Sequence, residues 1–249
     1  MSEDHKSLAI DLFCGLGGWT DGLLAAGYDV VGFDIERHQY GPDEYPAQLV
    51  LQDVLTIDGA QFRDATLIVA SPPCQAYSYR AMPWKKAKAL PPPDNSLFDA
   101  CFLIQAEASA AAGRHIPMVV ENVRGAQKWV GRARWKYGSF YLWGDVPILM
   151  PMDRVIPKVG GLNWSNFGKD GYKAEAFNTT AEKRQVRRDG IKQGGTWFDD
   201  ARGPSRTTSS KSKARKAAAA KIAKIPFALA SYVARYYYPL ALTAEPVDP

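Results

Sequence analysis

The residue of this sequence best suited to covalent chemistry is Cys74, which stands in the Pro-Pro-Cys-Gln segment at residues 72–75. The segment follows an apolar run at residues 66–70, and its two prolines stiffen the backbone around the thiol. A thiolate held in this way can attack an electrophilic carbon atom of a substrate. A lone cysteine is more often a small buried apolar residue, as we expect for Cys101 inside an apolar helical segment. The rigid loop makes Cys74 the candidate nucleophile.

Glu121 is the candidate for proton transfer to the same substrate. It follows the apolar run at residues 118–120 and begins the Glu-Asn-Val segment at residues 121–123. A charged residue directly after a buried strand is unusual unless it has a chemical role, and a carboxyl group can donate or accept a proton beside a nucleophile. Taken alone, Glu121 fits a solvated strand end better. Its combination with Cys74 favours a catalytic role.

A glycine-rich segment at residues 11–18, Asp-Leu-Phe-Cys-Gly-Leu-Gly-Gly, could let a ligand approach the backbone. Its spacing differs from the GxGxxG pattern of dinucleotide enzymes. Asp34 stands 19 residues after Gly15, where a carboxylate can accept hydrogen bonds from ribose hydroxyl groups. Asp53 could bind an adenine amino group. The alternative interpretation is a structural turn with two surface acids.

Apolar runs and helical spacing predict the elements that would position these residues. Residues 8–13, 29–34, 49–54, 66–70, 118–120 and 140–142 are predicted strands, and residues 19–26, 96–112 and 227–237 predicted helices. We expect Asn95 or Ser96 to cap the second helix and Gly113 to end it. The alternation predicts an α/β fold with a doubly wound, mostly parallel sheet, whose strands share one carboxyl edge. That edge would bring the glycine-rich turn, Cys74 and Glu121 together.

Together these segments resemble the DNA (cytosine-5)-methyltransferase family over about the first 150 residues. The matching segments stand in family order: residues 11–18, Asp34, Asp53, residues 72–75 and residues 121–123. The resemblance implies a Rossmann-like domain that binds S-adenosylmethionine, with Asp34 at the ribose and Ile35 and Asp53 at the adenine. It also implies that Cys74 attacks C6 of a flipped-out cytosine while Glu121 holds N3, without a metal ion.

The same resemblance assigns the remaining binding residues. The cofactor-binding set that it implies is Asp11, Phe13, Gly15, Gly17, Gly18, Asp34, Ile35, Asp53 and Pro72. The substrate-binding set is Gln75, Ser78, Asn122, Arg132 and Arg134. The two arginines match only part of the family's Gln-x-Arg-x-Arg segment, so the arginine that assists at O2 of the base is not assigned. The Lys-Ile-Pro segment at residues 224–226 is a shortened match to the family's closing segment. We expect it to pack a late helix against the cofactor domain.

The excess positive charge of the chain is C-terminal. The net charge is +5, and residues 201–244 carry nine Lys or Arg and no Asp or Glu. Such a stretch can neutralise phosphates, so we expect DNA-backbone contacts from Lys211, Lys213, Arg215 and Lys216. The alternative is a solvated helix face.

Composition limits the kind of protein. With 46% hydrophobic and 23% charged residues the chain is not disordered throughout, and it has no apolar run long enough to span a bilayer. The three cysteines are an odd and sparse set, which argues against a fold based on disulfides. We expect a catalytic domain at residues 1–150, an irregular target-recognition insert at residues 151–200, and a basic segment with a returning helix at residues 201–249.

These features predict a monomeric enzyme of the cytoplasm of a bacterium or a phage-infected cell, which methylates double-stranded DNA in a restriction-modification setting. Three other functions remain open. The same chemistry could act on RNA or on a pyrimidine nucleotide. The chain could be a nucleic-acid-binding module without catalysis, although it keeps both Cys74 and Glu121. A nicotinamide-dependent dehydrogenase would leave the Pro-Pro-Cys loop unexplained.

Overall fold

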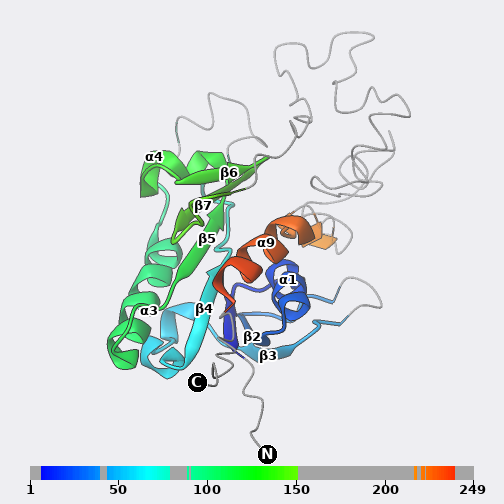
Figure 1. Cartoon of the computed structure of the whole chain (residues 1–249). Helices are drawn as coiled ribbons and strands as arrows, with labels where there is room; N and C mark the ends of the chain where they lie inside the picture. The colour runs from blue at the N-terminus through cyan, green and yellow to red at the C-terminus, as the bar shows by residue number, and fades with distance from the viewer. Residues whose placement is uncertain are drawn as a thin grey trace, which may run out of the picture.

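A computed structural model describes residues 7–39, 44–78, 89, 91–150, 216–217, 220–221 and 223–238. These residues form a seven-stranded sheet with strand order β3-β2-β1-β4-β5-β7-β6 (Figure 1). The strands are β1 (Leu8–Leu12), β2 (Asp29–Asp34), β3 (Gln48–Leu51), β4 (Ala65–Ala70), β5 (Met118–Asn122), β6 (Trp135–Tyr137) and β7 (Phe140–Gly144). The helices are α1 (Gly18–Ala26), α3 (Ser96–Ala112), α4 (Gln127–Val130) and α9 (Phe227–Tyr237), with short 3₁₀ turns η1 (Val54–Thr56), η2 (Gly59–Phe62) and η4 (Arg124–Ala126).

The first five strands are parallel, and β7 runs antiparallel between β5 and β6. β1 lies inside the sheet, with β2 on one side and β4 on the other. The strand order therefore reverses between β1 and β4. In open α/β sheets, ligands bind outside the carboxyl ends of the strands at such a reversal. The expected doubly wound, mostly parallel sheet is confirmed.

Helices cover both faces of this sheet. Alternate residues of a strand point to opposite faces, and the apolar residues of β4 and β5 divide between two clusters accordingly. One cluster takes Phe98, Cys101 and Ile104 from α3. The other takes residues from α1 and α9, which lie side by side over the opposite face (Figure 1). The late helix therefore completes the core on the α1 side.

α1 and α9 approach closely because α1 carries glycines where the helices meet. A Cβ atom at Gly22 would lie 2.5 Å from the Cβ of Ala230. One at Gly18 would lie 2.4 Å from the backbone nitrogen of Ile225. Neither position can hold a side chain without moving the backbone opposite. Gly18, the last glycine of the glycine-rich segment, therefore serves the packing of α1 against the residues that lead into α9.

The helix α3 has the limits expected from the sequence, but its start is capped differently. Asn95 occupies the N-cap position and its side chain makes no capping hydrogen bond. The Asp94 carboxylate accepts from the backbone N–H of Ser96 at 2.8 Å instead. The Asn95 side chain accepts from the hydroxyl of Tyr77 at 2.9 Å. Gly113 ends the helix with a φ of 64°, as expected.

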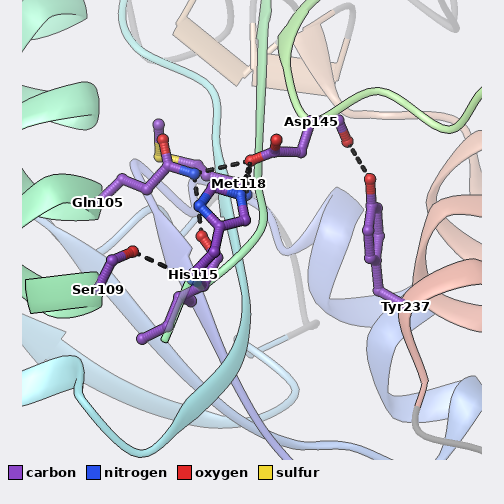
Figure 2. Close-up of polar contacts among 7 residues, drawn as sticks. Gln105, Ser109, His115, Met118, Asp145 and Tyr237 are labelled. Carbon is purple, nitrogen blue, oxygen red and sulfur yellow. Dashed lines mark hydrogen bonds and ion pairs between the residues drawn. The ribbon is translucent and has the colours of Figure 1, made fainter. Parts of the chain in front are cut away.

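A polar cluster fastens the sheet at the end opposite the carboxyl edge (Figure 2). Asp145, directly after β7, accepts hydrogen bonds at Oδ2 from Gln105 Nε2 at 2.7 Å and from the backbone N–H of Met118 at 2.9 Å. His115 Nε2 lies 3.0 Å from the same oxygen atom. The hydroxyl of Tyr237 donates to the backbone carbonyl of Asp145. These contacts join α3, β5, β7 and α9.

Several expectations need correction. Glu121 and Asn122 belong to β5 and do not follow it. The strand β6 was not expected, and β7 extends two residues beyond the predicted end at residue 142. The third strand is shorter than predicted, because Val54 begins the turn η1. The expected insert at residues 151–200 lies outside the described residues. Within the described part, no helix has the length and apolar character needed to cross a membrane.

Candidate functional site

The parallel strands bring the predicted site segments to one edge of the sheet. Leu12, the last residue of β1, is aligned with Phe33 of β2 and with Ala70, the last residue of β4. Ala70 is in turn aligned with Val120 of β5. The glycine-rich turn, Asp34, the Pro-Pro-Cys loop and Glu121 therefore all emerge along the same edge.

The turn after β1 has an unusual backbone. Phe13 has a φ of 57°, the only positive value for a non-glycine residue in the part of the chain that the structure describes. Gly15 and Gly17 have φ values of 52° and 71°. The nearest atom to a Cβ built at Gly15 is the Phe13 carbonyl oxygen, 3.9 Å away, so no described atom crowds the backbone there. Strained left-handed residues cluster at ligand sites, and this turn offers half-buried backbone at Phe13 and Gly15 to a ligand.

Asp34, at the end of β2, is held as a carboxylate. Its Oδ2 accepts from the backbone N–H of Gly15 at 2.9 Å, and its Oδ1 accepts from Glu36 N and lies 3.3 Å from His38 Nε2. Burial alone would raise the pKa of Asp34, but these hydrogen bonds, that of His38 foremost, hold the pKa below its usual value. The same bond raises the pKa of His38. An ionised carboxylate has room for further donors, such as ribose hydroxyl groups.

Aliphatic side chains are exposed beside this carboxylate. Ile35 is 72% exposed, and Leu51 and Leu55 are each 54% exposed. Leu51 is aligned with Asp34 in the sheet. Asp53 lies between the two leucines in sequence and accepts from the backbone N–H of Leu55 at 3.0 Å. Apolar surface next to two carboxylates suits a nucleoside with a planar base, so these residues fit the adenosyl part of S-adenosylmethionine.

Asp11 lies beneath the turn and not at its open side. Its side chain is fully buried, and Oδ2 accepts from the Thr20 hydroxyl at 2.6 Å, while Oδ1 has no hydrogen-bond partner among the described residues. Burial raises the pKa of Asp11 to about 7, against the hydrogen bond from Thr20, which lowers it. Asp11 therefore lies on the core side of the turn and joins β1 to α1 through Thr20.

The cysteine loop is joined to β5 by a buried side chain. Asn122, 1% exposed, donates from Nδ2 to the carbonyl oxygen of Pro72 at 3.0 Å. The loop then turns back, with the backbone N–H of Tyr77 donating to the carbonyl of Cys74 at 3.0 Å. Glu121 precedes Asn122 in the strand and points to the opposite face, where it is 9% exposed. Asn122 thus holds the loop, and its role in substrate binding stays a prediction.

Other contacts at this edge were not expected from the sequence. Trp19 at the start of α1 donates from Nε1 to the Ser71 hydroxyl at 2.9 Å. A Cβ at Gly125 would lie 2.1 Å from the carbonyl oxygen of Tyr77. Both contacts join segments more than forty residues apart, for which no motif gives a signal. They hold the cysteine loop from two further sides.

Cys74 is the most accessible of the three cysteines. Cys14 and Cys101 are buried, while Cys74 is half-buried. Burial raises the pKa of both Cys14 and Cys101, which keeps them protonated and unreactive. Cys101 is therefore the buried apolar residue that we expected.

The remaining predicted residues lie nearer the surface. Gln75 is exposed and Ser78 half-buried, in the cysteine loop. Arg132 and Arg134 are exposed in the segment that leads into β6. Lys216 is exposed, whereas Lys211, Lys213 and Arg215 lie outside the described residues. The DNA-binding role of these side chains stays a prediction.

Comparison with known proteins identifies the N-terminal half. Residues 8–128 match the family described as C-5 cytosine-specific DNA methylase. No curated protein matches the chain.

Similar solved structures include a variant of DNMT2 from Spodoptera frugiperda, 17% identical over 49% of this chain and 37% of that one, with a TM-score of 0.34. A protein described as a prophage-encoded DNA modification methyltransferase, from E. coli, is 22% identical over 50% of this chain and 34% of that one, with a TM-score of 0.34. The methyltransferase EhMeth of Entamoeba histolytica is 17% identical over 50% and 40%, with a TM-score of 0.33. The chain therefore spans well under half the length of these proteins.

Proposed function

We propose, from the premise that residues 8–128 form a domain of the C-5 cytosine-specific DNA methylase family, that this chain methylates C5 of cytosine in DNA. The observation that carries the proposal is the 3.0 Å hydrogen bond from Asn122 to the Pro72 carbonyl. It fixes the loop of the candidate nucleophile to the strand of the candidate acid. Both groups are thereby mounted on rigid elements beside the glycine-rich turn.

The cofactor site consists of the turn and the adjoining strand ends. The open backbone at Gly15 and the Phe13 side chain would contact the methionine part, Asp34 would accept from the ribose, and Ile35 and Asp53 would contact the adenine. When bound, S-adenosylmethionine supplies an electrophilic methyl group on a positively charged sulfur atom. Gly18 and Asp11 contribute indirectly. Gly18 packs against Ile225, and Asp11 accepts a hydrogen bond from Thr20.

In the first step the Cys74 thiolate adds to C6 of the cytosine ring. A sulfur lone pair forms the S–C6 bond, and the electrons of the C5–C6 double bond become available at C5. The Glu121 carboxyl group gives its proton to N3, which neutralises the charge that would otherwise build up on the ring. C5, a poor nucleophile in free cytosine, can then attack the methyl group.

The later steps restore both ring and enzyme. After the C5–methyl bond has formed, the proton on C5 is lost to a base and its electron pair re-forms the C5–C6 double bond. Cys74 leaves C6 with the electrons of the S–C6 bond, and N3 returns its proton to Glu121. The two ring faces are covered in a stacked duplex, so the base has to leave the stack, at a cost of a few kcal/mol.

Covalent trapping tests this proposal. DNA that carries 5-fluorocytosine cannot lose a proton from C5 after methyl transfer, so the enzyme remains bound to C6. The protein with S-adenosylmethionine is expected to form an adduct that survives denaturing electrophoresis. Cys74→Ala is expected to form none and to lose methyl transfer by about 1,000-fold or more, while it still binds the cofactor.

Cys101→Ala is the matched control, because it removes a buried thiol away from this edge, and it is expected to keep the adduct. Trapping by Cys74→Ala at the level of the unchanged protein contradicts the mechanism. An adduct that forms with RNA of the same sequence and not with duplex DNA contradicts the substrate.

A further inference from the structure

A chain of three polar groups lies under the glycine-rich turn: Asp11 and Thr20 are buried and Tyr45 is half-buried. Tyr45 stands outside every motif. The Tyr45 hydroxyl lies 2.5 Å from Thr20 Oγ1, and Thr20 donates its single hydroxyl hydrogen to Asp11 Oδ2 at 2.6 Å. Tyr45 is therefore the donor to Thr20. Burial, with the nearby Asp11 charge, raises the pKa of Tyr45, so the phenol keeps its proton. The chain links β1, α1 and the segment before β3.

Two glycines make room for this tyrosine. Gly32 is aligned with Asp11 in the sheet, and a Cβ there would lie 2.1 Å from the Tyr45 hydroxyl oxygen. A glycine inside a strand weakens the strand unless another group needs the space, and here Tyr45 occupies it. On its other side the tyrosine reaches the turn itself. A Cβ at Gly17 would lie 3.3 Å from Tyr45 Cε2 and 3.0 Å from Pro46 Cδ.

Backbone hydrogen bonds hold part of the turn. Its backbone donates from Cys14 to Phe33, from Gly15 to Asp34 and from Gly17 back to Cys14. The glycines of the turn reach other conformations at small energetic cost. The Tyr45 ring and Pro46 close the space into which Gly17 could otherwise move. A binding site held in its bound shape loses less entropy on ligand binding and so binds more tightly.

We propose that Tyr45 is a positioning residue for the cofactor turn, and that its hydrogen bond to Thr20 sets the affinity for S-adenosylmethionine. The inference rests on the function proposed above. Tyr45 acts through Gly17 and Thr20 and leaves the chemical step to Cys74 and Glu121. Loss of the hydroxyl therefore weakens cofactor binding and leaves turnover at saturating cofactor unchanged.

Calorimetric titration of the full chain with S-adenosylmethionine tests the inference. Tyr45→Phe keeps the ring and removes the hydroxyl, and it is expected to raise the Kd by about 5- to 30-fold, as for the loss of one buried hydrogen bond. In methyl-transfer assays the KM for the cofactor is expected to rise by a similar factor, with kcat unchanged. Tyr28→Phe is the matched control, because it removes a buried tyrosine hydroxyl bonded to the Ala234 carbonyl at 3.2 Å, away from the turn.

A second pair of variants at Thr20 keeps the inference testable if Tyr45→Phe does not fold. Thr20→Val removes the acceptor and is expected to weaken cofactor binding, whereas Thr20→Ser retains the hydroxyl and is expected to retain the affinity. Equal affinity in the unchanged protein, Tyr45→Phe and Thr20→Val overturns the inference, as does an equal loss in Tyr28→Phe. An unchanged protein that does not bind S-adenosylmethionine overturns the proposed function itself.

Discussion

His38 makes the edge of the sheet that carries Asp34 sensitive to pH. The groups of the described residues that act on its ring include the carboxylates of Asp34 and Glu36, which favour its charged form, and the Lys216 ammonium, which opposes it. Because the pKa of His38 is raised in the folded chain, its stabilisation is complete below the ordinary histidine value and is lost as the pH rises through the raised pKa. Asp34 behaves in the opposite way, since its pKa is lowered and its contribution is lost only in acid.

The substitution His38→Gln tests this dependence. Gln can still donate a hydrogen bond to Asp34, but it carries no charge at any pH. The unchanged protein is expected to exceed the variant in free energy of unfolding by about 1 kcal/mol at pH 5.5, as for a charge-assisted hydrogen bond, and by less at pH 9. Urea denaturation at both pH values measures the two differences. An identical difference at pH 5.5 and pH 9 would show that protonation of His38 has no part in it.

The candidate catalytic residues could be chosen from the sequence, but the residues that hold their loops and strands could not. Cys74 and Glu121 can be selected as candidates by their residue types and by their positions after apolar runs. Tyr45 and Asn122 act through single contacts with residues far away in the sequence, at Thr20 and Pro72. Such contacts depend on strand order and register, which apolar periodicity does not specify.

The contact between α1 and α9 reverses the usual effect of glycine in a helix. In an exposed helix, replacing glycine by alanine stabilises by about 0.5–1 kcal/mol. At Gly22 the added methyl group would lie 2.5 Å from the Cβ of Ala230 and from the backbone nitrogen of Ser231. Neither atom belongs to a flexible side-chain end, so the helices have to separate.

We therefore expect Gly22→Ala to destabilise the chain by about 1–3 kcal/mol, as overpacked cores do. Thermal and urea denaturation measure the change. The exposed Ala25 on the same helix is the control, since Ala25→Gly is expected to cost only the helix preference of about 1 kcal/mol. A Gly22→Ala chain that is more stable than the unchanged protein would contradict the close contact.

Most elements could be predicted because their apolar periods are strong. The limits of α3 and α9 follow from runs of apolar residues with clear ends at Gly113 and Pro226. The strand β6 was missed because its three residues alternate only between half-buried and exposed at the edge of the sheet. Glu121 and Asn122 were placed after β5 because polar residues normally end a buried strand. Here the antiparallel partner β7 extends the pairing over both.

The core on the α1 face of the sheet is built from two distant parts of the sequence. Residues of β1 and α1 begin it, and residues 225–234 complete it. The family match ends at residue 128, yet the α1 face of the sheet is covered by side chains from beyond residue 224. The hydroxyls of Tyr232 and Tyr237 donate to the carbonyls of Leu149 and Asp145, so the segment after β7 is joined to α9 as well. Figure 2 shows Tyr237 directed at Asp145, opposite the Gln105 and His115 side chains. Five apolar side chains from Ile225 and from α9 are buried at this face: Ile225, Leu229, Ala230, Val233 and Ala234.

Removal of α9 should therefore unfold the domain and not merely shorten it. A chain that ends at residue 223 would expose Trp19 and Leu23, which are 2% and 1% exposed in the complete core, and burial of one such side chain is worth about 1.5–3 kcal/mol. Several such losses together are comparable to the 5–15 kcal/mol by which a domain is stable. We expect this chain to lose its cooperative thermal transition and to bind a dye for exposed apolar surface. A chain that ends at residue 238 keeps α9 and is expected to melt as the complete chain does. If both truncated chains melt alike, α9 is an appendage, and the glycines of α1 need another explanation.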